Sequence, residues 1–598
     1  MRIMRIQLWK RLAAGISNRA IDPFPVRKVI HSYGPTQARS DLIASLNVAL
    51  LAFPQGMAYA MIAGLPIEYG LFGSAVATIV GPLFSGSRFI VLGPTNATSV
   101  LLLSTFLALG IPEGDRGALL PILLCLTALF QILGAVLNIS TLIQYISRSV
   151  VVGYITAAAV LIIANQLQNI LGFKIHGAST FAGVVVRTAE SISETQWPTV
   201  ALSILTAAIF IVLRKWFAKL PNVAVTLVLS SLVAVGFDRF GLAVEKLKAV
   251  SAGSFALTVP QLDFSTLGLL SSAALAIAFL SILEGSSIGK SLAAMSGARL
   301  NTNQELFSMG MANLACGFLN GMPASGSLTR SVLNWTSGAA TTMASLFCGL
   351  ICVALFLGLG SFIAYIPKAS LAVVVVFVAL SLVNPAQIRL VTKTTPGDAA
   401  VFLLTFGAAL LFPLDMAIYF GAGLSIILFL YQAGEPDLIE YTYDDKGELS
   451  ELQKHESRRV PEISIVHVEG SLFFAAAELL QEQLRRVCDD PNLKIIILRL
   501  KNAHHLDAST ILALEELIGF MREHDRHLII SGARKEVYRI CKRTGLLDLV
   551  GRKNFFMEWP QNPTLSSRNA LKRAQEILGS KDAEISIFGE TVMKGSEK

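Results

Sequence analysis

Long apolar runs fill the first two thirds of the chain, whereas the last third mixes polar and apolar residues as water-soluble proteins do. From residue 41 to about 432 the runs are interrupted mainly by Gly, Pro, Asn and isolated charges. A helix that crosses a bilayer needs about 20 mostly apolar residues. The pattern therefore predicts an α-helical membrane domain over 41–432.

Fourteen apolar segments can be delimited in this region, in two series of seven. The first covers 42–63, 69–86, 94–111, 117–138, 142–171, 199–214 and 221–237. The second covers 266–289, 303–319, 327–339, 341–362, 369–385, 397–412 and 415–432. If the N-terminus is cytoplasmic, the basic residues at the segment ends fall on that same side, as the positive-inside rule asks. We expect fourteen spans, with repeats at about 41–238 and 265–432, and both chain ends in the cytoplasm.

Composition and charge agree with a membrane protein. Of 598 residues, 53% are hydrophobic and only 15% are charged. The net charge of +8 collects in a basic N-terminal segment, 1–40, and in loops, which favours a cytoplasmic membrane face over nucleic-acid binding. The six cysteines have no metal-ligand spacing. We find no Gly-rich phosphate loop with a lysine and no nucleophile–base pair, so we expect neither an enzyme nor a cofactor.

Two of the apolar segments are unusual, and they occupy corresponding places in the two series. The third begins with Gly93-Pro94-Thr95, and the tenth begins with Met322-Pro323 and runs into Ser325–Ser331. Each reads as a short helix that is entered through Pro and Gly, with Ser and Thr in its first turn. Paired interruptions of this kind indicate an inverted repeat with a binding site between the halves. The alternative is two ordinary helices that start at a proline.

The start of a helix inside the membrane suits a negative ion, because its unpaired N–H groups carry partial positive charge. Arg330, in the first turn of the tenth segment, adds a full positive charge. In the first span, Pro54 and Gly56 are expected to break the helix next to further polar side chains. Packing around a proline kink is the alternative explanation for those side chains. The candidate substrate ligands are Gln55, Tyr59, Thr95, Ser327, Thr329 and Arg330.

An acidic residue in the eighth segment, Glu284, is the expected partner of Arg330. Charges inside a membrane segment are functional by default. One interpretation is a structural ion pair that neutralises Arg330. The other is a proton site: an anion that arrives beside Arg330 weakens its hold on Glu284, which then takes up a proton. Charge balance alone would couple the two movements.

Three motifs, in order, resemble the sulfate permease (SulP) family. They are FPQGMAYAMIAGLPIEYGLFG at 53–73, GPTNATS at 93–99 and SGSLTRS at 325–331. The resemblance covers about residues 40–560. It implies fourteen spans in a seven-plus-seven inverted repeat, core and gate subdomains, a homodimer and an elevator-like movement of the core. Matched motif by motif, it assigns the same six side chains to substrate and Glu284 to proton coupling.

The favoured function is therefore symport of a small inorganic anion, sulfate above all, with protons across the cytoplasmic membrane. Arg330 in SGSLTRS argues for the sulfate-like branch, because the sodium-coupled bicarbonate members lack that arginine. Nucleobase transporters carry an acidic residue on the tenth span instead, so Arg330 argues against a nucleobase as the substrate. Two alternatives stay open: a bicarbonate, chloride or dicarboxylate transporter, and an anion sensor that signals through the soluble tail.

The soluble tail begins with an acidic linker, 433–460, and continues with alternating strands and helices over 461–560. This alternation predicts a small α/β domain with a mostly parallel sheet. It resembles the STAS domain, which could bind a cytoplasmic partner. Ser509, two residues after Asp507, matches the phosphorylated serine of anti-sigma-factor antagonists, although this pair also makes a good helix N-cap. Residues 561–598 are expected to form a C-terminal tail with some helix.

Overall fold

The computed structural model describes residues 21–579 apart from 142–144, 176–180, 218–220, 251–256, 261–263, 435–436, 444–448, 453–457, 459, 473, 489, 505 and 560–564. Half of the predicted N-terminal segment and the end of the predicted tail lie outside these residues. The chain divides into two compact units, Met1–Ile426 and Ile427–Lys598. Each unit is described by itself.

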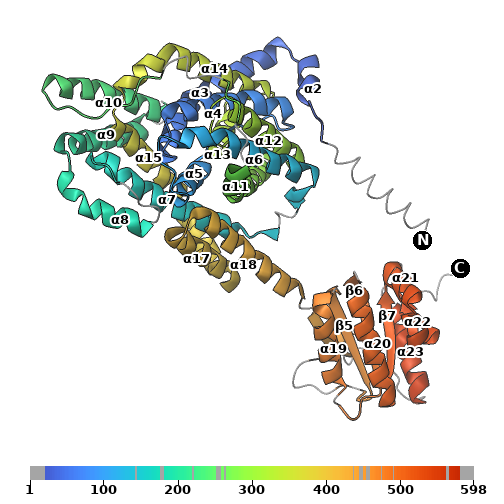
Figure 1. The fold of residues 1–598 in the computed structure, drawn as a ribbon. Helices are drawn as coiled ribbons and strands as arrows, with labels where there is room; N and C mark the ends of the chain where they lie inside the picture. The colour runs from blue at the N-terminus through green and yellow to red at the C-terminus, as the bar shows by residue number, and fades with distance from the viewer. Residues whose placement is uncertain are drawn as a thin grey trace. The chain divides into compact units, whose positions relative to one another are not determined.

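The first unit is built from helices (Figure 1). Because lipid offers no hydrogen bonds, helices satisfy the backbone of apolar segments internally. Every one of the predicted apolar segments falls on a helix. The first series corresponds to α3 (Pro35–Ile62), α4 (Ile67–Phe84), α5 (Asn96–Ala108), α6 (Arg116–Val136), α7 (Arg148–Leu171), α9 (Trp197–Trp216) and α10 (Asn222–Arg239). The second corresponds to α11 (Phe264–Ser296), α12 (Thr302–Phe318), α13 (Leu328–Thr336), α14 (Met343–Leu359), α15 (Lys368–Leu382), α17 (Pro396–Leu411) and α18 (Leu414–Gly434).

Ten helices within the described residues are long and apolar enough to cross a membrane. The protein is therefore a multi-pass α-helical membrane protein. Three short helices were not predicted: α2 (Val26–His31), α8 (Phe181–Glu190) and α16 (Pro385–Thr394). They are short and amphipathic, so their polar residues interrupt the apolar run by which the other helices were predicted. In α16, for example, Val391 is buried while its neighbours on both sides are not.

The helices pack into two groups. The first group contains α3, α4, α5, α6, α11, α12, α13 and α14, and the second contains α7, α9, α10, α15 and α17. Helix α18 joins the second group, since Gly421 lies so close to Thr405 of α17 that an added Cβ would sit 2.1 Å from its Oγ1. Contacts between the groups are sparser than those within them. We call them the first and second helix groups.

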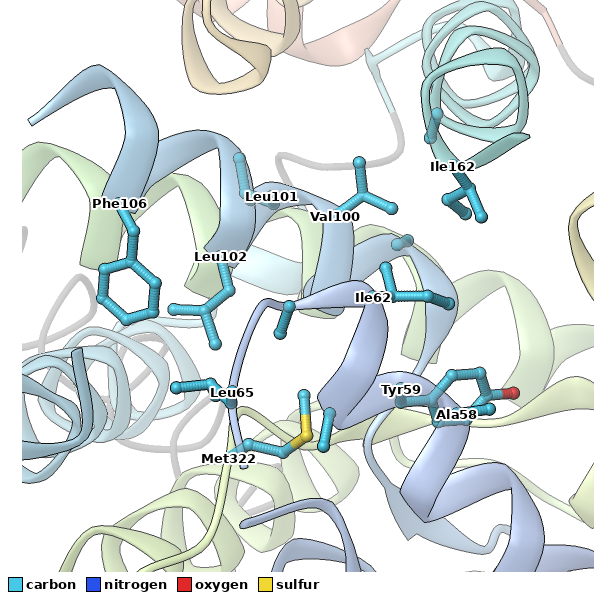
Figure 2. Packing of buried hydrophobic residues seen from close by; sticks show 14 of the residues in the cluster. Ala58, Tyr59, Ile62, Leu65, Val100, Leu101, Leu102, Phe106, Ile162 and Met322 are labelled. Carbon is cyan, nitrogen blue, oxygen red and sulfur yellow. The ribbon is translucent and has the colours of Figure 1, made fainter. Parts of the chain in front are cut away.

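A continuous apolar core fills the first group and the boundary with the second. Figure 2 shows part of it, with Leu65, Leu102, Phe106 and Met322 packed together. Short strands add one further connection: β1 (Leu92–Gly93) pairs antiparallel with β2 (Ser325–Gly326). These strands lead directly into α5 and α13, which Figure 1 places inside the helical unit.

The second unit contains a six-stranded sheet in the order β4-β3-β5-β6-β7-β8. Strands β5 (Ile463–Ser471), β6 (Ile495–His504), β7 (His527–Ala533) and β8 (Phe555–Met557) run parallel. Helices α19 (Phe474–Val487), α20 (Ala508–Glu523), α21 (Lys535–Thr544), α22 (Leu546–Val550) and α23 (Leu565–Leu578) complete the unit. The prediction of an α/β domain with a mostly parallel sheet is confirmed.

The predicted acidic linker is in part a pair of strands. β3 (Asp437–Tyr443) runs antiparallel to both β5 and β4 (Leu449–Glu451). We predicted a linker because the stretch is rich in acidic residues. One of them, Glu440, is instead bound within the folded domain: it accepts hydrogen bonds from Arg458 Nε (2.6 Å) and Ser464 Oγ (2.5 Å). At the other end, α23 packs on β6, β7 and β8 and buries Leu571. The folded domain thus extends on both sides of 461–560.

Candidate functional site

Thr95 starts α5 and connects it to the acidic residue of the site. Its side chain accepts from the backbone N–H of Thr98 (3.3 Å), and the Thr98 hydroxyl accepts from the N–H of Thr95 (3.2 Å). This reciprocal cap satisfies groups that a helix start leaves unpaired. The Thr95 hydroxyl also donates to Glu284 Oε2 at 3.2 Å. The predicted α5 terminus therefore contacts the predicted proton site.

Ser327 starts α13 in a similar way. Its hydroxyl accepts from the backbone N–H of Arg330, and its own N–H donates to the carbonyl of Val91 (3.1 Å). Val91 N–H in turn donates to the hydroxyl of Ser331 (2.9 Å). Together with the pairing of Gly93 with Ser325, these bonds fix the two helix starts beside each other. The two interrupted segments meet, as the sequence predicts.

Asn313 of α12, which we did not predict, holds the approach to β2. Its Oδ1 accepts from the N–H of Ala324 (2.8 Å), and its Nδ2 donates to the carbonyl of Ala324 (2.9 Å) and to Gln131 Oε1 (2.9 Å). A side-chain amide that binds both backbone groups of one residue replaces the missing strand partner. The signal in the sequence was an Asn between Ala312 and Leu314, in the interior of the predicted apolar segment 303–319.

Arg330 is the positive charge of the site and is completely buried. Its Nη2 donates to the carbonyl of Pro94 (2.7 Å), whereas Nε and Nη1 have no hydrogen-bond partner. Gly93 leaves room for the guanidinium, because an added Cβ would lie 2.6 Å from Nη1. Buried N–H groups without a partner are costly, and the N–H groups of a guanidinium form strong, charge-assisted hydrogen bonds to oxyanions. Two donors are thus available for an anion.

The predicted ion pair between Arg330 and Glu284 is absent, so this interpretation of Glu284 is wrong. Each ion pair within the described residues joins other partners. The two side chains contact adjacent residues at the start of α5 instead: Arg330 binds the carbonyl of Pro94, and Glu284 binds the hydroxyl of Thr95. Glu284 therefore lies beside the site without an arginine or lysine within 4.0 Å.

Gln55 and Tyr59 are both buried on α3, which runs unbroken through Pro54 from Pro35 to Ile62. The expected helix break is therefore wrong. Gly56 serves close packing instead, since an added Cβ would lie 2.7 Å from the carbonyl oxygen of Gly70 on α4. Gln55 Oε1 has no hydrogen-bond partner.

The other predicted ligands differ in exposure. Thr95, Ser327 and Arg330 are buried, but Thr329 is exposed in the first turn of α13. The predicted residues therefore come from α3, α5, α11 and α13, and all four helices belong to the first helix group. No set of three or more His, Cys, Asp or Glu side chains in the described chain could hold a metal ion. The positive potential comes from Arg330 and two helix starts.

In the soluble unit, Asp507 is the N-cap of α20. Its Oδ1 accepts from the backbone N–H and from the hydroxyl of Thr510, both at 3.0 Å. Ser509 is exposed in the first turn of the same helix. The capping role expected as an alternative for Asp507 is thus present, and Ser509 is open to solvent.

The chain belongs to the sulfate permease family, whose model matches residues 39–405. Residues 454–560 match the STAS domain. The protein is thus an anion transporter of this family and not an enzyme. Two relatives match most of the chain. The chain is 27% identical to "Sulfate transporter 4.1, chloroplastic" of Arabidopsis thaliana, covering 89% of this chain and 81% of the relative. It is 26% identical to a putative sulfate transporter, YvdB, of Bacillus subtilis, covering 88% and 97%.

Solved structures share the fold. Murine Solute Carrier 26 family member A9, an anion transporter in the inward-facing state, superposes with a TM-score of 0.83 at 19% identity, covering 93% of this chain and 94% of that one. The transmembrane domain of a cyanobacterial bicarbonate transporter, BicA, gives a TM-score of 0.58 at 20% identity, covering 66% and 98%. The membrane and STAS architecture of the family is therefore present here.

Proposed function

We propose that the protein takes up sulfate together with protons by secondary active transport across the cytoplasmic membrane. The observation that carries this proposal is the buried guanidinium of Arg330, whose Nε and Nη1 lack a partner where two helix starts meet. An oxyanion can accept a charge-assisted hydrogen bond from one of these N–H groups, and the partial positive charge of both helix starts favours it as well. The sulfate transporters among the relatives favour sulfate. Gln55, Tyr59, Ser327 and Thr329 complete the proposed ligand set.

Glu284 is the proposed proton carrier. Its carboxyl accepts from Thr95 and has no cationic partner within 4.0 Å, so its charge inside the membrane domain is not neutralised by an ion pair. In symport the carboxyl takes up a proton when the anion arrives and releases it when the anion leaves. Arg330 and Glu284 bind Pro94 and Thr95, two adjacent residues that lead into α5, so the anion and the proton would act on one backbone segment.

Fourteen spans in a seven-plus-seven inverted repeat are supported by the packing of the helices. When each helix of a contacting pair is replaced by its equivalent in the other series, the resulting pair is also in contact. The packing of α4 on α14 corresponds to that of α6 on α12, and α3 on α14 corresponds to α6 on α11. Likewise, α7 on α17 corresponds to α9 on α15. An inverted repeat predicts this correspondence, because equivalent helices bury equivalent faces.

The proposed transport movement is an elevator, in which the first helix group carries the anion past the second within a homodimer. All proposed ligands lie on the first group, and the boundary is mainly apolar. We further propose that both termini lie in the cytoplasm, where the STAS domain and the exposed Ser509 can meet a regulatory partner. Thus the bilayer, the anion, the proton and a second copy are the proposed partners.

The test is uptake of labelled sulfate into proteoliposomes under an inward proton gradient. We expect accumulation that disappears when the gradient is collapsed, and none with Arg330→Ala. For Glu284→Gln we expect sulfate exchange without accumulation driven by pH. A folded protein that moves bicarbonate and not sulfate would overturn the substrate but keep the site.

The same assay distinguishes a transporter from the alternative, an anion sensor. Flux through the purified protein without any added partner contradicts a sensor that carries little net transport. Binding of sulfate without flux, in a preparation whose thermal unfolding is cooperative, would contradict the transport proposal instead.

A further inference from the structure

Within the part of the chain that the structure describes, the hydrogen bonds that cross the boundary between the two helix groups include the following three. The hydroxyl of Tyr154 on α7 donates to the carbonyl of Ala97 on α5 (2.8 Å). The backbone N–H of Leu414 on α18 donates to the hydroxyl of Ser104 on α5 (2.9 Å). The hydroxyl of Tyr419 on α18 donates to the carbonyl of Ser272 on α11 (2.9 Å). The helices that receive these bonds, α5 and α11, carry Thr95 and Glu284.

The rest of this boundary is apolar and rich in small side chains. On the second group it presents Ala157, Ala158, Leu161, Ile162, Ala408, Ala409 and Ala417. Figure 2 shows Ile162 near Val100 of α5 and Ile62 of α3. Apolar contact is non-directional and tolerates a change of register. A hydrogen bond does not, because it weakens steeply when the donor and acceptor move out of range.

Of the three hydrogen bonds, the one donated by Tyr154 has its acceptor nearest in the chain to a residue of the candidate site. It is fully buried, and its acceptor, Ala97, lies two residues after Thr95 in the first turn of α5. Displacement of α5 along α7 therefore separates a buried hydroxyl from its acceptor. Ser104 lies further along the same helix and binds the first N–H of α18, which a helix start leaves unpaired.

We propose that Tyr154, Ser104 and Tyr419 are positioning residues that latch the anion-carrying helices to the second helix group in the orientation of this structure. The latch rests on the proposed elevator movement and deepens it. Each bond is present in one register of the two groups and is lost in another. The three residues thus set how the protein divides its time between orientations, and none of them needs to touch the anion.

The test measures the two orientations in liposomes by electron paramagnetic resonance. Spin-labelled unnatural amino acids at Val136 of α6 and Trp216 of α9, both exposed and in different groups, leave the native cysteines in place. We expect two distance populations whose ratio responds to sulfate and pH. Tyr154→Phe and Ser104→Ala should each lower the population of the present orientation about five-fold relative to the other, as the loss of one net hydrogen bond implies.

Ser370→Ala is the matched control. It removes the Ser370–Thr206 hydrogen bond (3.0 Å), which joins α15 to α9 inside the second group. It should lower the midpoint of thermal unfolding and leave the population ratio unchanged. Unchanged ratios in both latch variants, or an equal change in Ser370→Ala, would overturn the latch. One population under all conditions in the unaltered protein would overturn the elevator itself.

Discussion

The substitution Gly93→Ala tests whether Arg330 depends on its close approach to the β1 backbone. Gly93 has φ of 151°, in a region that favours glycine, and an added Cβ would lie 2.6 Å from Arg330 Nη1. Ordinary van der Waals contact begins at 3.4 Å, so the guanidinium must move by about 0.8 Å. The change is one methyl group, with no change in charge.

The magnitude follows from the bond between Arg330 and Pro94. If the whole shift is directed away from the Pro94 carbonyl, the 2.7 Å hydrogen bond lengthens to at most about 3.5 Å, outside the usual range. The loss of a hydrogen bond to a charged group costs about 1.5–3 kcal/mol. If the cost falls on the anion-bound state, sulfate binds about 10- to 150-fold more weakly.

The assay is sulfate titration calorimetry on the purified protein in nanodiscs. Gly110→Ala is the control, because Gly110 also has positive φ (65°) but nothing lies within 4 Å of its added Cβ. The control measures the cost of an L-residue at positive φ without a clash at Arg330; this cost is smaller than at Gly93, because φ of 65° lies in the left-handed region that other residues can adopt. A folded Gly93→Ala variant that binds sulfate as the unaltered protein does would refute the reasoning.

Three further predictions concern other residues. Asn313→Ala removes the hydrogen-bond partners of both backbone groups of Ala324 and should lower the free energy of unfolding by about 1–3 kcal/mol for each buried group. We expect a lower midpoint of thermal unfolding, and an unchanged midpoint contradicts this. Asp507→Ala should cost about 1 kcal/mol through the lost cap at Thr510, and Asp507→Asn should restore most of it in chemical denaturation of the STAS unit. Burial raises the pKa of the Cys541 thiol to about 11, so iodoacetamide at pH 8 should modify this thiol only after denaturation. Peptide mass spectrometry measures the modification, and rapid modification of the folded protein contradicts the prediction.

The sequence was sufficient for the apolar helices and for the two interrupted segments of the site. Apolar length located the membrane segments, and Pro and Gly before a Ser- or Thr-rich turn located the starts of α5 and α13. Both signals depend only on neighbours in the chain. The pairing of Gly93 with Ser325 confirms that the two starts meet, and the buried position of Arg330 agrees with a role inside the membrane domain.

What the sequence could not provide is the direction in which side chains point. Glu284 and Arg330 have opposite charges, and charge alone suggested an ion pair. Their directions depend on the rotation of α11 and α13 about their axes, which many distant contacts decide together. The strand β3 was missed for a related reason, since the partner of Glu440 is Arg458, 18 residues further along the chain. An acidic stretch looks like a linker until that partner is known.

The geometry also bears on how an anion and a proton can influence each other without a direct ion pair. Both charged residues come from the second series of helices, and both are held by the first: Arg330 by the carbonyl of Pro94, Glu284 by the hydroxyl of Thr95. An ionised Glu284 requires the Thr95 hydroxyl as a donor, whereas a protonated one can donate to it. The same hydroxyl accepts from Thr98 N–H and so caps α5. Proton exchange at Glu284 thus acts on Thr95, the cap of α5, and Pro94, the residue before it, binds Arg330. These two adjacent residues connect the proposed proton site with the proposed anion site.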